Sequence, residues 1–428
     1  MRAGGQLIIV DLKKLIGSHF PALASRDYAI FWSGQFLSLI GTWMQSTTQP
    51  YLAYRLSGNP FDLGLIGMAS TLPTFFLALP GGVLVERFDK RKTVIAMQTV
   101  MMFQALVLSL LTIFGFIQIW HIILLSLLLG VASSIEITAR QAMLVEIVGK
   151  SSLPNAIALQ ATIFQAARVI GPAMMVPFIL FIKGNGEGYA FLANAISYAI
   201  VITGLTFVHT PFRQEREKTP LRILADLKES LRYISNTREV AMIILMATVF
   251  GFIGFPLLQQ IPVFGRDVLR VAGEVEGDVA SRTSLIFTFV GFGALTSAFS
   301  IAAFSPKLKG KLLLAGQVTF SLAVILVSVV TDQRHLLAGF FAVGLGMVST
   351  LATMNTLIQM QVPNQLRGRV FSTYLWGLQG VSPFGSLLIG WSVTQFGVQI
   401  TSLSAGVICV FAIATIHALT PGLRKLES

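Results

Sequence analysis

The sequence predicts an all-α polytopic membrane protein with 12 transmembrane helices in two six-helix halves. The chain of 428 residues is 54% hydrophobic and only 12% charged, with a mean hydropathy of +0.75. Soluble domains carry about 25% charged residues, so this chain has too few to cover a water-facing surface. Apolar runs recur from one end to the other, and each is long enough to cross a bilayer.

The apolar runs fall into two groups, 28–208 and 239–419, on either side of a polar linker at 209–238. The expected spans are 28–54, 62–85, 92–117, 119–140, 155–181 and 188–208, then 239–263, 281–304, 310–331, 335–361, 368–395 and 398–419. We expect the flanking segments, 1–27 and 420–428, to be cytoplasmic. The first should contain an interfacial helix from Leu12 to Ala24.

The distribution of basic residues predicts the orientation. With the N-terminus in the cytoplasm, the segments on that side hold 24 of the 31 lysines and arginines, and the outer loops hold 6. Such an excess on one side follows the positive-inside rule, so both termini are expected in the cytoplasm. The net charge of +12 therefore indicates topology, and we expect no nucleic-acid partner. No metal-ligand cluster or nucleotide-binding motif is visible, so neither an enzyme nor a cofactor is expected.

The linker contains one amphipathic segment, "PLRILADLKESLRYI" at 220–234. Its apolar residues recur at helical spacing: Leu221, Ile223, Leu224, Leu227, Leu231 and Ile234. This pattern predicts a helix that lies on the inner membrane surface.

A dense group of charges follows the second span, in "GGVLVERFDKRK" at 81–92. The two halves also share a weak repeat, because "IGPAMM" at 170–175 in the fifth span has a counterpart in "VSPFGS" at 381–386 in the eleventh. Two such halves with both termini inside resemble the major facilitator superfamily, a family of membrane transporters. The charged loop resembles its signature, G-x-x-x-D-R-x-G-R-R. The matching positions are Gly82, Glu86, Arg87, Lys90 and Arg91, and Asp89 replaces the second glycine.

This resemblance implies a gating loop. Gly82 would let the second span approach the other half closely, and Glu86 would lie at the positive N-terminal end of the eleventh span. Arg87 would pair with an acidic group such as Glu146. The alternative is a plain positive-inside loop, which explains the basic residues but not Glu86 or Asp89.

Three further segments resemble the branch of the superfamily that contains enterobactin exporters and macrolide efflux pumps: 139–160, 166–172 and 366–374. Gly171 and Pro172 match the centre of the antiporter signature of drug exporters, G-x-x-x-G-P-x-x-G-G. Ala167, Met175 and Val176 stand where that signature has glycines. The resemblance therefore implies export, although a Gly-Pro pair in a membrane helix can also be a simple kink.

Polar residues within the spans are candidates for the lining of a substrate cavity. The first span carries a stripe at steps of three and four residues, made of Gln35, Ser38, Thr42, Gln45 and Gln49. Thr353, Asn355 and Gln379 are candidates in the second half. We expect these residues to line a cavity, with hydrogen bonding between packed helices as the alternative. A neutral lining suits an amphipathic or apolar solute.

Ionisable residues within a membrane are costly and therefore candidates for function. Glu136 and Arg140 are expected in the inner part of the fourth span and Arg168 near the middle of the fifth. Glu136 is either a proton carrier or one half of a fixed pair with Arg140, four residues away. Arg168 is either an anion receptor, a fixed counter-charge or a structural residue.

The predicted function is proton-coupled efflux of an amphipathic small molecule, such as a siderophore, a macrolide or a drug-like compound, by a monomer in the bacterial inner membrane. A lysophospholipid flippase and an uptake permease are alternatives on the same fold. A membrane sensor or scaffold that transports nothing is the alternative from a different class.

Overall fold

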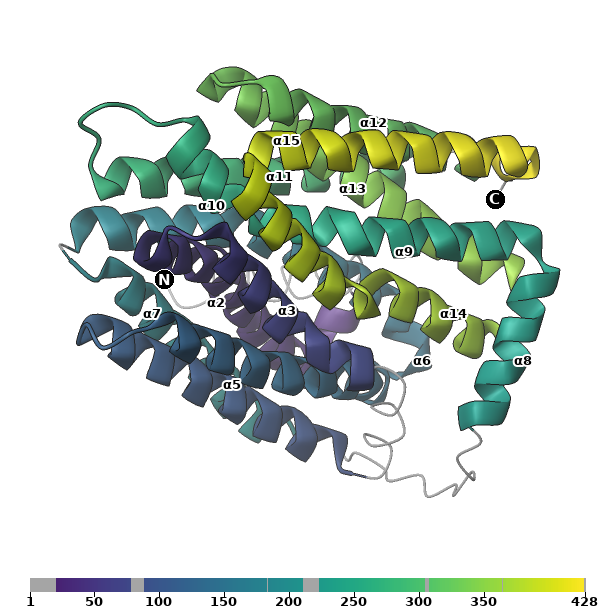
Figure 1. Ribbon diagram of the computed structural model, residues 1–428. Helices are drawn as coiled ribbons and strands as arrows, with labels where there is room; N and C mark the ends of the chain where they lie inside the picture. Colours follow the sequence, from purple (N-terminus) through teal and green to yellow (C-terminus); the bar gives the residue numbers. More distant parts are fainter. Residues whose placement is uncertain are drawn as a thin grey trace, which may run out of the picture.

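The computed structural model describes residues 21–77, 88–182, 184–210, 223–304, 308–363 and 365–426. These residues form helices and short connections, and no strand occurs among them. Figure 1 shows the helices in two groups along a common direction, one from the first half of the chain and one from the second.

The N-terminal half begins with a short 3₁₀ turn, η1 (Pro21–Ala24). Its helices are α2 (Arg26–Ser57), α3 (Pro60–Leu77), α5 (Lys90–Ile113), α6 (Ile119–Phe181) and α7 (Gly186–Thr206). α6 contains the predicted fourth and fifth spans, separated at Gly149. Because Gly149 has a φ of 71°, the backbone leaves the helical conformation there. The fourth span therefore continues to Gly149, beyond the predicted end at 140.

The linker helix α8 (Ile223–Asn236) leads into the C-terminal half. That half consists of α9 (Arg238–Gln259), α10 (Ile261–Val263), η2 (Phe264–Val268), α11 (Glu276–Phe304), α12 (Lys309–Val329), α13 (Gln333–Gln361), α14 (Arg367–Leu375), η3 (Trp376–Gly380), α15 (Ser382–Leu419) and η4 (Pro421–Lys425). α15 contains a second glycine break at Gly397, where φ is 81°.

The predicted architecture of 12 membrane helices is confirmed. Ten segments of the described chain are long and apolar enough to cross a membrane. One of them, Arg367–Leu419, has 53 residues, about 80 Å at 1.5 Å per residue, and the break at Gly397 divides it into two crossings. α2 is the remaining crossing. Its 32 residues are long enough, but its many buried polar side chains make it less apolar than the others.

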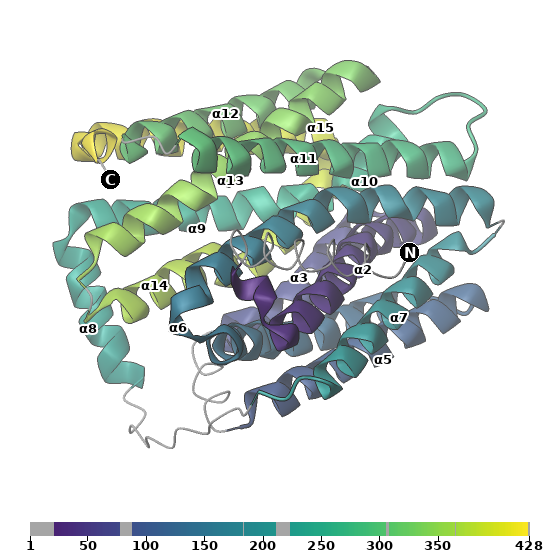
Figure 2. The ribbon, with the colours of Figure 1, turned by 180° about the vertical axis from the view of Figure 1, so that it is seen from behind.

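The bundle has two ends, which we call the linker end and the far end. The linker end contains α8, the start of α5 and the break at Gly149, whereas the far end contains Gly58, the start of α7 and α10. Figure 1 shows the linker end on the right, with α8 and the C-terminus, and Figure 2 shows the same bundle from behind.

Several predicted features lie outside the described residues. These are most of the interfacial helix from Leu12 to Ala24, the linker at 211–222 and the first part of the gating loop, with Gly82, Glu86 and Arg87. The domain boundaries and the cytoplasmic position of the termini stay predictions.

Candidate functional site

A central cavity of about 460 Å³ lies between the two halves. This volume lies within the range of small-molecule sites, about 300–1,000 Å³. Both halves contribute to its wall, which consists of Trp43, Ser46, Thr47, Thr71, Thr74, Phe164, Arg168, Pro172, Phe255, Leu258, Gln259, Phe287, Val290, Met347, Leu351, Gln379, Ser382 and Ser386. Apolar and neutral polar side chains dominate this wall, and Arg168 is the charged residue among them.

Arg168 is held deep in the wall by contacts with both halves. It is only 8% exposed, and its guanidinium lies over the ring of Trp43 of α2, 5.4 Å from the ring centroid. Its Nη2 donates to the sulfur of Met347 of α13 at 3.5 Å. Trp43 in turn packs edge-on against Phe164, with 5.5 Å between the ring centroids. Cation–π contact offsets part of the cost of burying the charge.

Gly171 and Pro172, which match the centre of the antiporter signature, hold α6 against its neighbours. A Cβ at Gly171 would lie 2.5 Å from the Cβ of Trp43 and 2.8 Å from the backbone nitrogen of Met44, so glycine is required for this approach of α2. The carbonyl of Pro172 accepts a hydrogen bond of 2.6 Å from Ser284 of α11 in the other half. The pair therefore joins α2, α6 and α11 beside the cavity.

The two halves pack closely on the far side of the cavity. A Cβ at Gly64 of α3 would lie 2.5 Å from the carbonyl oxygen of Ser386 of α15, and a Cβ at Gly390 would lie 2.9 Å from the Cα of Gly64. On the other side of the bundle, a Cβ at Gly291 of α11 would lie 2.8 Å from the carbonyl oxygen of Arg168. Small residues allow such close helix contacts in membranes, so this packing closes the cavity toward the far end.

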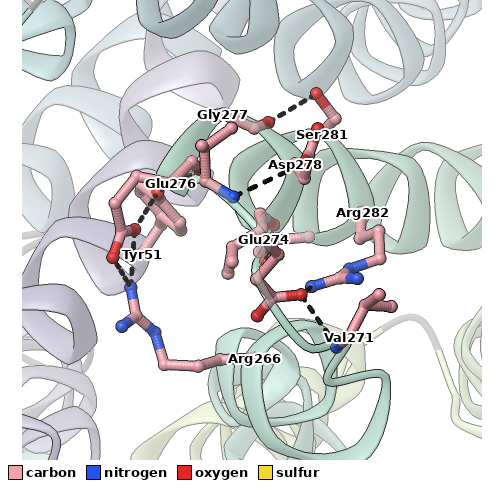
Figure 3. Close-up of polar contacts among 12 residues, drawn as sticks. Tyr51, Arg266, Val271, Glu274, Glu276, Gly277, Asp278, Ser281 and Arg282 are labelled. Carbon is pink, nitrogen blue, oxygen red and sulfur yellow. Dashed lines mark hydrogen bonds and ion pairs between the residues drawn. The ribbon is translucent and has the colours of Figure 1, made fainter.

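A polar cluster at the far end adds to this closure (Figure 3). The hydroxyl of Tyr51 of α2 donates to Oε2 of Glu276 at 2.9 Å, and Arg266 binds the same carboxylate at 2.7 Å. The hydroxyl of Tyr54 donates to Asp267 in the same way. Two tyrosines of the N-terminal half are thus bonded to two carboxylates of the C-terminal half.

Glu274 stabilises the loop at this end. It accepts hydrogen bonds from Arg282 and from the backbone N–H of Val271. Burial raises the pKa of Glu274, but these hydrogen bonds and the charges of Arg282 and Arg266 lower it more, so its pKa lies below the ordinary value.

At the linker end, three of the predicted gating residues are described. Asp89 is the N-cap of α5, where its carboxylate accepts from the backbone N–H of Lys92 at 2.9 Å. Lys90 pairs with Glu146 of α6, the acidic residue that we expected for Arg87. Arg91 donates to the carbonyl of Thr206 of α7 at 2.8 Å. These contacts join helices within the N-terminal half, and the role of the loop as a gate stays a prediction.

The polar stripe of α2 lies away from the cavity, within the N-terminal half. Gln45 donates to Gln104 of α5 at 3.1 Å and accepts from Asn194 of α7 at 2.7 Å, while Gln49 donates to Ser126 of α6 at 2.6 Å. Thr42 bonds to the hydroxyl of Tyr198, and Gln35 and Ser38 are buried. None of the five stripe residues is in the cavity wall. Three of them form hydrogen bonds between packed helices, which was the alternative, and the stripe does not line this cavity as we expected.

The candidates in the second half divide in the same way. Gln379 is in the cavity wall, on a π-helical turn, η3, between α14 and α15. Such turns often occur at functional sites because they change the direction of a side chain. Thr353 is buried in α13, and Asn355 bonds to Gln359 on the same helix; neither lines the cavity.

Glu136 and Arg140 form the ion pair that their spacing predicts. The Nε of Arg140 lies 3.0 Å from Oε1 of Glu136, and Gln98 of α5 donates to the same oxygen at 3.1 Å. Glu136 is 4% exposed and lies outside the cavity wall. The structure therefore brings Glu136 and Arg140 together and leaves Arg168 apart from them.

Few sequence signals indicated the other wall residues, because hydroxyls and apolar side chains such as Trp43, Thr71 and Ser382 occur throughout the spans. Small residues at helical spacing were the available signal. Gly64 and Gly67 on α3 and Ser386 and Gly390 on α15 mark the faces that meet.

Comparison with known proteins agrees with this architecture. The family described as "Transmembrane secretion effector" matches residues 17–428. The nucleoside transporter NupG, a solved structure, has a TM-score of 0.69 at 12% identity, over 92% of this chain and 99% of that chain. This likeness shows the fold.

Curated relatives are similar over most of their length. The staphyloferrin A transporter of Staphylococcus aureus is 24% identical, over 89% of this chain and 93% of the relative. Macrolide efflux protein A of Streptococcus pyogenes is 18% identical, over 92% and 96%. The enterobactin exporter EntS of Salmonella paratyphi A is 22% identical, over 90% and 89%. The predicted resemblance is confirmed: the chain is a transporter of the major facilitator superfamily and belongs to its family of transmembrane secretion effectors.

Proposed function

We propose that this protein exports an amphipathic small molecule by alternating access. The observation that carries the proposal is the cavity of about 460 Å³ between the halves, which close helix packing shuts off from the far end. A molecule would enter from the linker end and leave when Gly64 and Gly390 separate. The mixed wall suits a solute with an apolar body and a few polar groups.

Charge supports the proposed orientation of the chain, and similarity supports the proposed direction of transport. The basic residues concentrate in the segments of the linker end, which the positive-inside rule assigns to the cytoplasm. A cavity that is closed at the far end would exchange its cargo with the cytoplasm in this state, and this holds for import as well as for export. Two relatives, the macrolide efflux protein and the enterobactin exporter, are named for export, which supports the same direction here.

We propose proton antiport as the energy source, with Glu136 as the carrier to test. Its carboxylate is buried between α5 and α6 and is held by Gln98 and Arg140. A change in the spacing of these helices during transport would break the contacts of this carboxylate with Gln98 and Arg140.

An efflux assay with a cavity-filling variant tests the function. Cells that lack their own pumps are loaded with a panel of siderophores, macrolides and dyes, and retention is compared with and without the protein. Leu351→Trp places a large side chain in the cavity, whereas Leu322→Trp adds the same side chain at a position of α12 that is 56% exposed. We expect the wild type and Leu322→Trp to lower retention of the exported compound and Leu351→Trp to lose this effect. Equal efflux by both variants would refute the assignment of the cavity.

A further inference from the structure

We propose that Arg168 binds the anionic group of the transported molecule, so that the cavity selects amphipathic anions over cations. This inference rests on the proposed function and adds the substrate class to it. Three observations support it: the partners of Arg168, the charge of the cavity wall and the arrangement of the aromatic rings beside the guanidinium.

Arg168 differs in its partners from four other buried or half-buried arginines of the described chain. Arg55 pairs with Glu187, Arg140 with Glu136, Arg266 with Glu276, and Arg282 with Glu274. Within the described residues, the acceptor that the guanidinium of Arg168 reaches is the sulfur of Met347. A thioether is a weak acceptor, whereas a guanidinium has five N–H donors, so most of its hydrogen-bonding capacity is left for a ligand.

The wall of the cavity contains no carboxylate among its described residues, so the charge of Arg168 is not compensated there. In a poorly hydrated site, a charge interacts with another much more strongly than it does in water. A cationic solute would therefore be repelled, and an anionic solute would supply the missing counter-charge. The neutral polar groups of the wall, such as Gln259 and Gln379, can bond to a solute of either charge and do not alter this preference.

The surroundings of Arg168 also suit an amphipathic anion. Trp43 lies under the guanidinium and Phe164 packs against Trp43, so an aromatic surface borders the charged group. Phe255 and Phe287 belong to the same cavity wall, from the C-terminal half. An anionic group could accept two parallel hydrogen bonds from the guanidinium while its apolar part contacts these rings.

The competing explanation is purely structural, because Arg168 contacts α2 through Trp43 and α13 through Met347. Both explanations predict that loss of Arg168 disturbs the protein. They differ in one readout, the dependence of binding on the charge of the solute, which a structural residue would not control.

Three probes that share one apolar body measure this dependence: 1-pyrenebutyrate, 1-pyrenebutanol and 1-pyrenebutylamine, which are anionic, neutral and cationic at pH 7.5. Binding to the purified protein in phosphatidylcholine nanodiscs is followed by energy transfer from tryptophan to pyrene. The part of the energy-transfer signal that is lost in Trp43→Phe reports binding of the probe in the cavity. We expect the butyrate to bind about tenfold to hundredfold more tightly than the butanol, the factor that corresponds to hydrogen bonds with a charged group, and the amine to bind least.

Substitutions of Arg168 then test the cause. Arg168→Met should keep the affinity for pyrenebutanol within about threefold and lose the preference for the butyrate, whereas Arg168→Lys should keep the order of the three probes. Arg334→Gln removes a positive charge from an exposed far-end position and should leave the affinities for the three probes unchanged.

The inference is overturned if the wild type binds the amine as tightly as the butyrate, if no probe gives a cavity signal, or if Arg168→Met keeps the preference. Transport is measured separately, as movement of pyrenebutyrate across proteoliposomes. Charge-selective binding without movement would contradict the proposed transport and leave the anion site supported. Movement of all three probes at equal rates would support the proposed transport and contradict the anion site.

Discussion

Gly64→Ala should prevent full closure of the far end. The added Cβ would lie 2.5 Å from the carbonyl oxygen of Ser386 and 3.1 Å from the Cα of Gly390, where ordinary contacts begin near 3.4 Å. Both neighbours are backbone atoms, so they cannot rotate away. α3 and α15 would have to separate by about 1 Å at this level.

The size of the effect follows from the cost of overpacking. An extra group in a well-packed interface costs about 1–3 kcal/mol. The overpacking destabilises only the state that is closed at the far end, because α3 and α15 are apart in the open state. The ratio of far-end-closed to far-end-open molecules should therefore fall by a factor of about 5–150.

Labelling of a cavity cysteine measures this ratio. Cys409, the single cysteine of the chain, is buried and is replaced by alanine, and Ser46→Cys supplies a reporter in the cavity wall. A membrane-impermeant maleimide is added to one face of oriented vesicles at a time. We expect the wild type to be labelled faster from the linker face, and Gly64→Ala to be labelled at least about fivefold faster than the wild type from the far face.

Two other glycines provide the controls. Gly34→Ala places its Cβ 3.5 Å from Val201, an ordinary contact within the N-terminal half, and should change neither rate. Gly344→Ala places its Cβ 2.0 Å from the carbonyl of Val290 within the C-terminal half, so it should lower stability without exposing the reporter to the far face. Unchanged labelling in Gly64→Ala, or the same change in Gly344→Ala, would refute the assignment of Gly64 to the closure between the halves.

Three further predictions concern polar groups. Tyr51→Phe removes a hydrogen bond to the carboxylate of Glu276, worth about 1.5–3 kcal/mol, and should raise labelling from the far face in the same assay. Because its pKa is lowered in the folded protein, Glu274 should stabilise the far-end loop above the ordinary pKa of a glutamate, and this stabilisation should be lost as the pH falls through the lowered value. Glu274→Gln should therefore remove part of the difference in melting temperature between pH 7 and pH 3, and an unchanged difference would contradict this. Glu136→Gln should abolish the response of efflux to an imposed pH gradient, and a full response in that variant would exclude Glu136 as the proton carrier.

The fold was predictable because span length and hydropathy depend on the bilayer more than on tertiary contacts. α2 shows where this rule is weak. Its buried Gln35, Gln45 and Gln49 lower its hydropathy, so that it is not among the candidate spans by composition, although α6 and α7, which pack against it, contain such spans. The helical spacing of the stripe still indicated a face that avoids lipid.

The sequence did not predict which helices pack against the polar face of α2. Periodicity identifies residues that share one side of a helix, but not the neighbouring element. The partners of Gln45 and Gln49 are Gln104, Ser126 and Asn194, which lie on three other helices and far away in the sequence. These buried amides and hydroxyls bond to one another within one half, which leaves the wall of the cavity to residues with weaker sequence signals.

The contrast between Glu136 and Arg168 shows what local sequence does determine about a buried charge. Glu136 has Arg140 four residues later, and the two pair because that spacing places them on one face of a helix. The residues three and four positions from Arg168 are Phe164, Gln165, Gly171 and Pro172, and none of them carries a carboxylate. A partner for Arg168 therefore has to come from another helix or from a bound molecule. Trp43 and Met347 are the neighbours that the fold supplies, and neither neutralises its charge. A buried charge that the local sequence and the tertiary contacts of the described residues leave without a counter-ion is the reason to look for that counter-ion on the cargo.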